Sequence, residues 1–167
     1  SINVENLKNE IFKNPSKDHQ QITNLISKFS GQVSGESIIE KNQVEIKEIF
    51  EQENIEEILN KTYSLSQNGS EFSKNTEHEL KGKSPTSLKI TFKQIHMATE
   101  MSLRDALIME YRMVQRCQAS GDFYEGVRAM LVDKDRNPQW KPSNLDKVDE
   151  IWVNHFFEPL HEKDLKI

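Results

Sequence analysis

The sequence is poor in cysteine and has no long apolar run. Its 167 residues include one cysteine, Cys117, which excludes an internal disulfide framework and permits a reducing compartment. No segment approaches the ~20 consecutive apolar residues that a membrane-spanning helix requires, and none has the pattern of a signal peptide. We therefore expect no membrane partner. We also expect the Cys117 thiol to be inert, because it occupies an apolar position of a helix.

The sequence is also low in hydrophobic residues, at 35%, while 29% of its residues are charged. The two signs of charge are interspersed, a pattern typical of solvated helix faces rather than of disorder. A net charge of −5 lacks the basic footprint of a general nucleic-acid binder, so we expect no nucleic-acid partner. The thin apolar stripes indicate either a helical bundle with a polar surface or a helical piece that needs a partner surface to bury them.

Motifs for catalysis and metal binding are missing as well. The five histidines have no metal-ligand spacing, and one cysteine cannot build a zinc site. The string GQVSG at 31–35 resembles a hydrolase nucleophile elbow, but its spacing is G-x-x-S-G and no strand precedes it. No glycine-rich phosphate loop is present. The residues themselves therefore assign no catalytic group, no metal and no cofactor.

The composition changes near Lys83. All five arginines, all five methionines and both tryptophans follow it, while ten of the thirteen asparagines precede it. We interpret this change as two helical segments, 1–83 and 84–167, that together form one domain.

Helical periodicity runs through both segments. Apolar residues recur at the i, i+3, i+4, i+7 spacing of one helix face, and polar caps such as Asn54, Ser84 and Ser102 stand at helix starts. The predicted helices cover 22–29, 39–50, 54–63, 72–80, 84–99, 102–119, 122–132 and 143–158. No alternating strand pattern is present, even beside the Asn-Gly turn at 68–69. The predicted fold is all-α, a bundle of about eight short amphipathic helices.

The predicted helix 102–119 has an apolar arc wider than half its circumference, and Glu110 falls in the middle of that arc. A buried carboxylate must be paired, hydrogen-bonded or protonated. We expect Glu110 to be a buried structural carboxylate that pairs with Arg128, Lys134 or a backbone amide. The alternative is an acid or base with a tuned pKa, and the structural role is favoured because structural networks also perturb pKa values.

The predicted helix 84–99 carries a basic stripe of Lys89, Lys93 and His96. Such a stripe can bind a phosphate, although exposed lysines are more often simply solvated. Ile90 and Met97 form a minor apolar strip beside it. We expect this strip to contact something outside the core, and we expect concentration-dependent self-association, which makes a homo-oligomer one of the partners to consider.

Five short strings occur in a fixed order in the second segment. They are SPTSLKIT at 84–91, MEYR at 109–112, DFYEGVRA at 122–129, DKD at 133–135 and PQWKP at 138–142. Together they resemble the signature of the 3-hydroxyisobutyryl-CoA hydrolases, thioesterases of the crotonase (enoyl-CoA hydratase/isomerase) superfamily. Weaker similarity runs back to about residue 5. The resemblance marks 84–167 as a crotonase-type C-terminal helical segment.

This resemblance implies a parent enzyme that hydrolyses 3-hydroxyisobutyryl-CoA in mitochondrial valine breakdown. The family's oxyanion-hole amides and catalytic carboxylates belong to an N-terminal core that no part of this sequence matches. No catalytic residue is therefore carried over, and the chain alone is expected to be inactive. The implied partners are that core and the acyl-CoA substrate, of which CoA is a part rather than a cofactor. Lys89 and Lys93 are the candidates for contact with CoA phosphates.

A second hypothesis belongs to a different class of protein. A hydrolase-like chain can be reused as a structural or interaction subunit, as in the mitochondrial ribosomes of some lineages, which contain a homologue of this enzyme. The catalytic groups of the N-terminal core discriminate between the two hypotheses, because an enzyme retains them and a scaffold does not need them.

Overall fold

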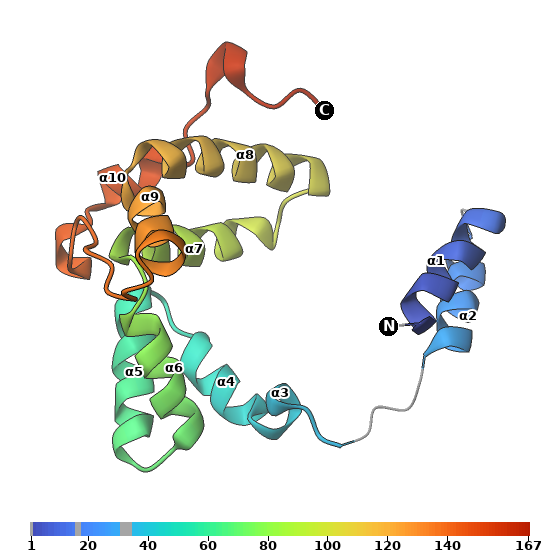
Figure 1. Ribbon diagram of the computed structural model, residues 1–167, viewed down its shortest axis with the longest axis horizontal. Coiled ribbons are helices and arrows are strands. Elements are labelled where there is room, and N and C mark those ends of the chain that lie inside the picture. Colours follow the sequence, from blue (N-terminus) through green and yellow to red (C-terminus); the bar gives the residue numbers. More distant parts are fainter. Residues whose placement is uncertain (1, 16–17, 31–34) are drawn as a thin grey trace. The chain divides into compact units, whose positions relative to one another are not determined.

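The computed structural model describes residues 2–15, 18–30 and 35–167, and every regular element in these ranges is helical (Figure 1). The all-α fold is confirmed. In the same ranges no helix has both the length and the apolar character needed to cross a membrane. Residues 31–34 of the GQVSG string lie outside the described ranges. The elements are α1 (Ile2–Lys13), α2 (His19–Phe29), α3 (Ile38–Lys41), α4 (Gln43–Phe50), α5 (Ile55–Gln67), α6 (Glu71–Lys81), α7 (Pro85–Ala98), α8 (Leu103–Ala119), α9 (Asp122–Val127), the π-helical turn η1 (Arg128–Val132), the 3-10 turn η2 (Leu145–Lys147), α10 (Glu150–His155) and the 3-10 turn η3 (His161–Lys163).

The chain forms two compact units, Ser1–Lys41 and Asn42–Ile167. The composition change near Lys83 lies inside the second unit, between α6 and α7. In the first unit α1 and α2 lie side by side (Figure 1). Helix α2 contains the predicted helix 22–29 but starts earlier, at His19, and α1 was not predicted. None of the side chains that the structure describes in this unit is buried. The first unit therefore has little core of its own.

The second unit contains two separate clusters of buried apolar side chains. One cluster lies where α7, α8 and α10 meet, and its buried members are Ile90, Met109, Met113, Val148, Val153 and Phe156. The other joins α4 to α5 through Ile49, Ile55 and Ile58. Helix α7 reaches both clusters, since Ile90 belongs to the first while Leu88 and Phe92 pack against the second. The unit is therefore organised around α7.

Helices α5 and α6 form an antiparallel hairpin (Figure 1). Helix α5 starts at its predicted cap, because the side chain of Asn54 accepts a hydrogen bond of 2.8 Å from the Glu57 amide. The hydroxyl of Ser70 caps α6 in the same way. Between the two helices the chain turns at Gly69, whose φ of +94° lies in the left-handed region. The Asn-Gly pair thus connects two helices, as predicted.

Three of the predicted helices are divided in the structure. The predicted helix 39–50 forms α3 and α4, which are separated at Asn42. The chain from residue 143 forms only the short turn η2, and α10 starts later, at Glu150. The reason is the cap at Asp149, whose carboxylate accepts a hydrogen bond of 2.7 Å from the Trp152 amide. The predicted helix 122–132 is likewise two elements, since α9 ends at Val127 and continues as a π-helical turn.

Arginines of α8 form hydrogen bonds with the C-terminal tail. The Nε of Arg112 donates to both carboxylate oxygens of Asp164, at 2.8 and 3.0 Å. Arg104 Nε donates to the carbonyl oxygen of Ile167 at 2.8 Å. A planar guanidinium suits such multiple contacts better than a lysine would. This side of α8 is therefore occupied by the tail.

We expect Gly69→Ala to destabilise the chain by about 1–2 kcal/mol, because an added Cβ strains a left-handed residue. Nothing lies within 4 Å of that Cβ, so the cost is conformational rather than steric. The matched control is Gly82→Ala, whose backbone is right-handed helical and whose Cβ would have 3.6 Å to its nearest neighbour. Urea denaturation should show a loss for the first variant and no loss for the second. Equal losses would contradict the assignment.

Candidate functional site

The described part of the chain contains an open apolar groove. It has a volume of about 840 Å³ and lies between α5 and α6 on one side and α8, α9 and η1 on the other, with α7 along it. Its floor includes Ile55 and Ile58 from one core cluster and Ile90 and Phe156 from the other. The lining residues that remain largely exposed form its rim, namely Phe50, Ile95, Phe123, Met130 and Leu131.

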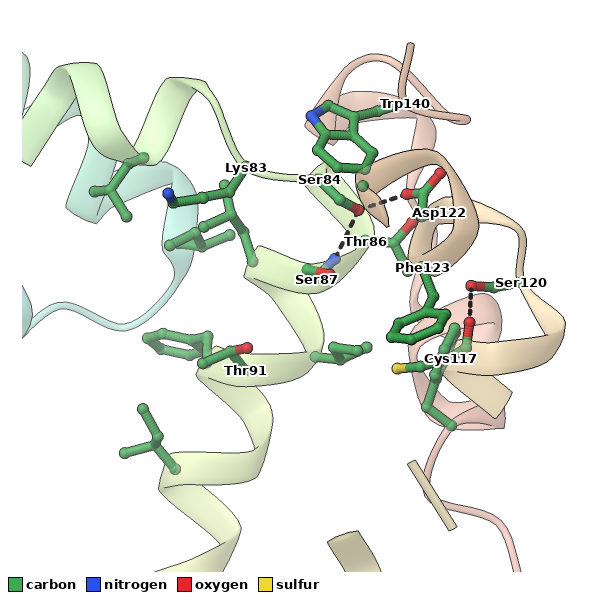
Figure 2. Close-up of a pocket in the computed structure, with 18 of the residues that line it drawn as sticks. Lys83, Ser84, Thr86, Ser87, Thr91, Cys117, Ser120, Asp122, Phe123 and Trp140 are labelled. Atoms are coloured by element: carbon green, nitrogen blue, oxygen red, sulfur yellow. Dashed lines mark hydrogen bonds between the residues drawn. The ribbon is translucent and has the colours of Figure 1, made fainter. Parts of the chain in front are cut away.

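One end of the groove is held together by a buried hydrogen-bonded cluster (Figure 2). The hydroxyl of Ser84 accepts from the Ser87 amide at 3.1 Å, which caps α7, and donates to the carboxylate of Asp122 at 2.5 Å. The other carboxylate oxygen of Asp122 accepts from the Lys141 amide at 3.0 Å. Both Ser84 and Asp122 are buried. This cluster fixes the start of α7 to the start of α9 and to the extended segment that follows η1.

Trp140 closes the same end of the groove. Its indole Nε1 donates to the carbonyl oxygen of Gly82 at 3.1 Å, and its ring lies against Gly126 of α9. A Cβ added to Gly126 would lie only 3.3 Å from the ring. Glycine at this position therefore allows the close approach of the helix and the indole.

Arg128 organises the loop that carries Trp140. Its guanidinium donates to the carboxylates of Glu125, Asp133 and Asp135, and to the carbonyl oxygen of Asn137. The hydrogen bonds from Arg128 and from the Gln139 amide lower the pKa of Glu125 from 4.5 to about 2. The carboxylate is therefore fully ionised at neutral pH. The loop is a structural clamp rather than a reactive site, because each of these charges has a partner.

The floor of the groove contains one polar group that lacks a partner. Thr86 is 4% exposed, and its Oγ1 makes no hydrogen bond. A buried hydroxyl without a partner costs about 1–3 kcal/mol. Figure 2 shows it in the groove beside the hydrogen-bonded pair of Ser84 and Asp122.

Both predicted phosphate contacts have partners within the chain. The side chain of Lys89 is 16% exposed, and its Nζ lies 2.7 Å from a carboxylate oxygen of Glu56. The same Nζ donates to the carbonyl oxygen of Val148 at 3.0 Å. Lys93 donates to the side-chain oxygen of Asn154, and its ammonium lies 5.6 Å from the centre of the Phe157 ring. The structure thus uses the two lysines to hold elements together, and their contact with CoA phosphates stays a prediction.

The expected burial of Glu110 is wrong. Glu110 is exposed and accepts a hydrogen bond of 3.0 Å from the side chain of Gln94 on α7; its partner is not Arg128 or Lys134. The reason is the face on which α8 packs. Met109 and Met113 are buried, while Leu103, Leu107 and Val114 on the Glu110 side remain exposed.

The expectation for the Ile90 and Met97 strip is also wrong. Ile90 is 4% exposed and belongs to a core cluster, and Met97 packs against the same cluster. On the other apolar side of α7, Leu88 and Phe92 pack against the second core cluster, while Ile95 is exposed. Helix α7 has apolar residues on two sides, and periodicity alone does not show which side is buried more deeply. The strip therefore gives no basis for self-association.

Cys117 lines the groove and is partly buried. Burial raises the pKa of its thiol, which lowers the fraction of thiolate, the nucleophilic form. Figure 2 shows the thiol and the ring of Phe123 pointing toward α7. In the described ranges no group of three or more histidine, cysteine, aspartate or glutamate side chains could hold a metal ion.

Sequence reasoning missed the groove and its anchoring cluster. Ser84, Asp122, Gly126 and Trp140 all lie in the strings that carry the family resemblance. The only signal in the sequence was that each of these strings contains small, aromatic or acidic residues, which are suited to close contacts. Nothing in a single sequence pairs them.

We expect Asp122→Ala to lower the free energy of unfolding by about 1–3 kcal/mol, because it leaves the buried Ser84 hydroxyl and Lys141 amide without their acceptor. Glu110→Ala should change it by at most about 0.5 kcal/mol, since the site is exposed. Chemical denaturation of both variants measures the difference. Equal effects would contradict the burial described for these two carboxylates.

The Arg128 clamp predicts a pH-dependent stability. Because the folded pKa of Glu125 is about 2 rather than 4.5, its stabilisation is present above pH 4.5 and is lost as the pH falls toward 2. Glu125→Gln should therefore lower Tm at pH 7, and the difference from the parent chain should shrink between pH 4.5 and 2. The control is Glu162→Gln, an exposed carboxylate. A Tm difference that does not change with pH would refute the clamp.

Comparisons with known proteins show the family of this chain. The family model for enoyl-CoA hydratase/isomerase matches residues 1–157. The mitochondrial 3-hydroxyisobutyryl-CoA hydrolase of Gallus gallus is 40% identical over 93% of this chain and 40% of its own length. That of Danio rerio is 36% identical over 100% of this chain and 44% of its own length. This chain thus spans less than half of these relatives.

Two solved structures share the fold. A carnitinyl-CoA dehydratase from Mycobacterium thermoresistibile matches 98% of this chain and 44% of its own, with a TM-score of 0.76 at 21% identity. An enoyl-CoA hydratase from Rhodobacter sphaeroides matches 89% of this chain and 44% of its own, with a TM-score of 0.74 at 26% identity. The family model and the relatives together show that this chain belongs to the enoyl-CoA hydratase/isomerase family of the crotonase superfamily.

Proposed function

We propose that this chain is the C-terminal helical part of a mitochondrial 3-hydroxyisobutyryl-CoA hydrolase, and that it covers a catalytic core which the sequence does not include. The observation that carries the proposal is the match to the Gallus gallus hydrolase, 40% identical over 93% of this chain but only 40% of that protein. The parent protein would act in valine breakdown, as the resemblance implies.

The reaction is the hydrolysis of a thioester. Water adds to the thioester carbonyl, the C–S bond breaks, and 3-hydroxyisobutyrate and the free thiol of CoA leave. Charge develops on the carbonyl oxygen in the transition state, so catalysis depends on donors aimed at that oxygen. The proposal assigns those donors and the catalytic carboxylates to the core, and it assigns to this chain the covering of the core.

The groove supports the assignment of a covering role to this chain. It exposes large apolar side chains that a finished domain would bury. The Ser84–Asp122 hydrogen bond, at 2.5 Å, holds the end of the groove in one shape before any partner binds. A preformed surface of this kind suits a covering element.

The proposal predicts that the chain alone releases no CoA thiol from 3-hydroxyisobutyryl-CoA. A chimera tests the second half of the proposal. In it, this chain replaces the stretch of the Gallus gallus hydrolase that it matches, and the same hydrolase with that stretch deleted is the control. Release of free thiol, followed with a thiol-reactive dye, should occur with the chimera and not with the control.

Enzyme-like turnover by the chain alone would contradict the proposal. A folded chimera without activity would also contradict it and would favour the structural subunit instead.

A further inference from the structure

The carboxylate of Asp164 is surrounded by hydrogen-bond donors and positive charge. The Nε of Arg112 donates to both of its oxygens, at 2.8 and 3.0 Å, and the Nη2 of the same guanidinium donates to one of them. The hydrogen bonds from Arg112 lower the pKa of Asp164, and the charge of Arg116 and a hydrogen bond from the Leu160 amide act in the same direction. Guanidinium groups combined with a main-chain amide are typical of sites that bind oxyanions.

Asp164 does not satisfy all of these donors. The Nη1 of Arg116 is buried and has no hydrogen-bond partner, while the Nη2 of the same side chain lies 3.5 Å from the carbonyl oxygen of Pro159. A buried donor without an acceptor is costly, and more so when it carries charge. The site therefore has a guanidinium nitrogen that needs an acceptor which the tail does not provide.

The charges at this site do not balance either. Two guanidinium groups, those of Arg112 and Arg116, act on the single carboxylate of Asp164. The clamp at Arg128 is the opposite case, because three carboxylates there lie around one guanidinium. The pair of arginines on α8 therefore has positive charge left for a further negative group.

A phosphate group matches this site better than a carboxylate does. A carboxylate has two oxygens, and Arg112 already engages both of those of Asp164. A phosphate monoester has three acceptor oxygens and a charge of about −1.5 to −2 at pH 7. Two of its oxygens can bind one guanidinium in the planar fork geometry, which leaves the third for a donor such as the Nη1 of Arg116.

An external anion would compete with an ion pair rather than with the core. The side chains of Arg112 and Asp164 are 24% and 18% exposed, so the pair is within reach of solvent. Asp164 belongs to neither core cluster, and no residue after Phe156 is buried. Displacement of the Asp164 carboxylate therefore leaves the packing of the second unit intact.

From these observations we propose that Arg112, Arg116 and the Leu160 amide form a binding site for a phosphate group, free or as a monoester, and that Asp164 fills this site when no phosphate is present. Neither arginine lines the apolar groove. The inference therefore goes beyond the proposed function and does not depend on it.

Titration of the chain with inorganic phosphate tests the site. Proton–nitrogen correlation NMR follows the Leu160 amide and the Nε–H of Arg112, and sodium chloride at the same ionic strength is the control for screening. We expect both signals to shift and to saturate with phosphate but not with chloride. Shifts that do not saturate, or that chloride reproduces, would overturn the proposal.

Phosphoethanolamine serves as the probe for a monoester. Saturation of the same signals by this compound upholds the site for both forms of the ligand. Saturation by inorganic phosphate alone upholds it for the free ion and overturns the monoester.

Arg116→Gln tests the donor that lacks a partner. We expect it to weaken phosphate binding at least tenfold, because it removes the second positive charge and the free Nη1. The matched control is Lys74→Gln, which removes the same charge from an exposed position of α6 and should change the affinity by less than about twofold. Equal losses in the two variants would indicate general electrostatics and would overturn the proposal.

Asp164→Asn tests the competition between the tail and phosphate. Asparagine has nearly the same shape and retains one acceptor oxygen, but it lacks the charge, so phosphate should bind at least tenfold more tightly than to the parent chain. Glu162→Gln, which removes a charge from an exposed position of the same tail, should raise the affinity by about twofold at most. A purely structural ion pair predicts that Asp164→Asn lowers Tm without any gain in affinity, and that result would overturn the proposal.

Discussion

The buried hydrogen bond between Ser84 and Asp122 is the contact on which the arrangement of the second unit depends. It joins residues 38 positions apart in the sequence and also caps α7 through the Ser87 amide. Because Asp122 in turn accepts from the Lys141 amide, three segments meet at one carboxylate. A buried carboxylate with all its partners in place rigidifies what it joins, and its loss leaves several groups unsatisfied at once. The cluster thus links the start of α7, the start of α9 and the segment at Lys141 at one end of the groove.

The hydrophobic interior next to this hydrogen-bonded cluster is incomplete. Helix α7 contributes to both core clusters of the second unit, and the space between those clusters is open and apolar. The proposed function accounts for the low hydrophobic content of the sequence, since a chain that buries its apolar faces against another part of a protein needs fewer apolar residues of its own. The unpartnered hydroxyl of Thr86 fits this account, because it has a place in a core that is not yet closed.

The sequence predicted local structure well and packing poorly. The caps at Asn54, Ser84 and Ser102 are all confirmed, because a cap is formed by residues two or three positions apart. Glu110 was misplaced because α8 is apolar on more than one side, and only its neighbours decide that Met109 and Met113 face inward. Ile90 was misjudged for the same reason. The groove itself depends on contacts such as Trp140 with Gly82, which no local pattern encodes.

The central claim is that the second unit is completed by another part of a hydrolase. Hydrogen–deuterium exchange at the backbone amides of α7 and α9 tests it most directly, comparing the chain alone with the same chain inside a complete hydrolase. The account predicts that exchange at these amides slows by at least tenfold in the complete protein, while exchange in the α5–α6 turn is unchanged. Equal exchange at the groove walls in the two proteins would contradict it.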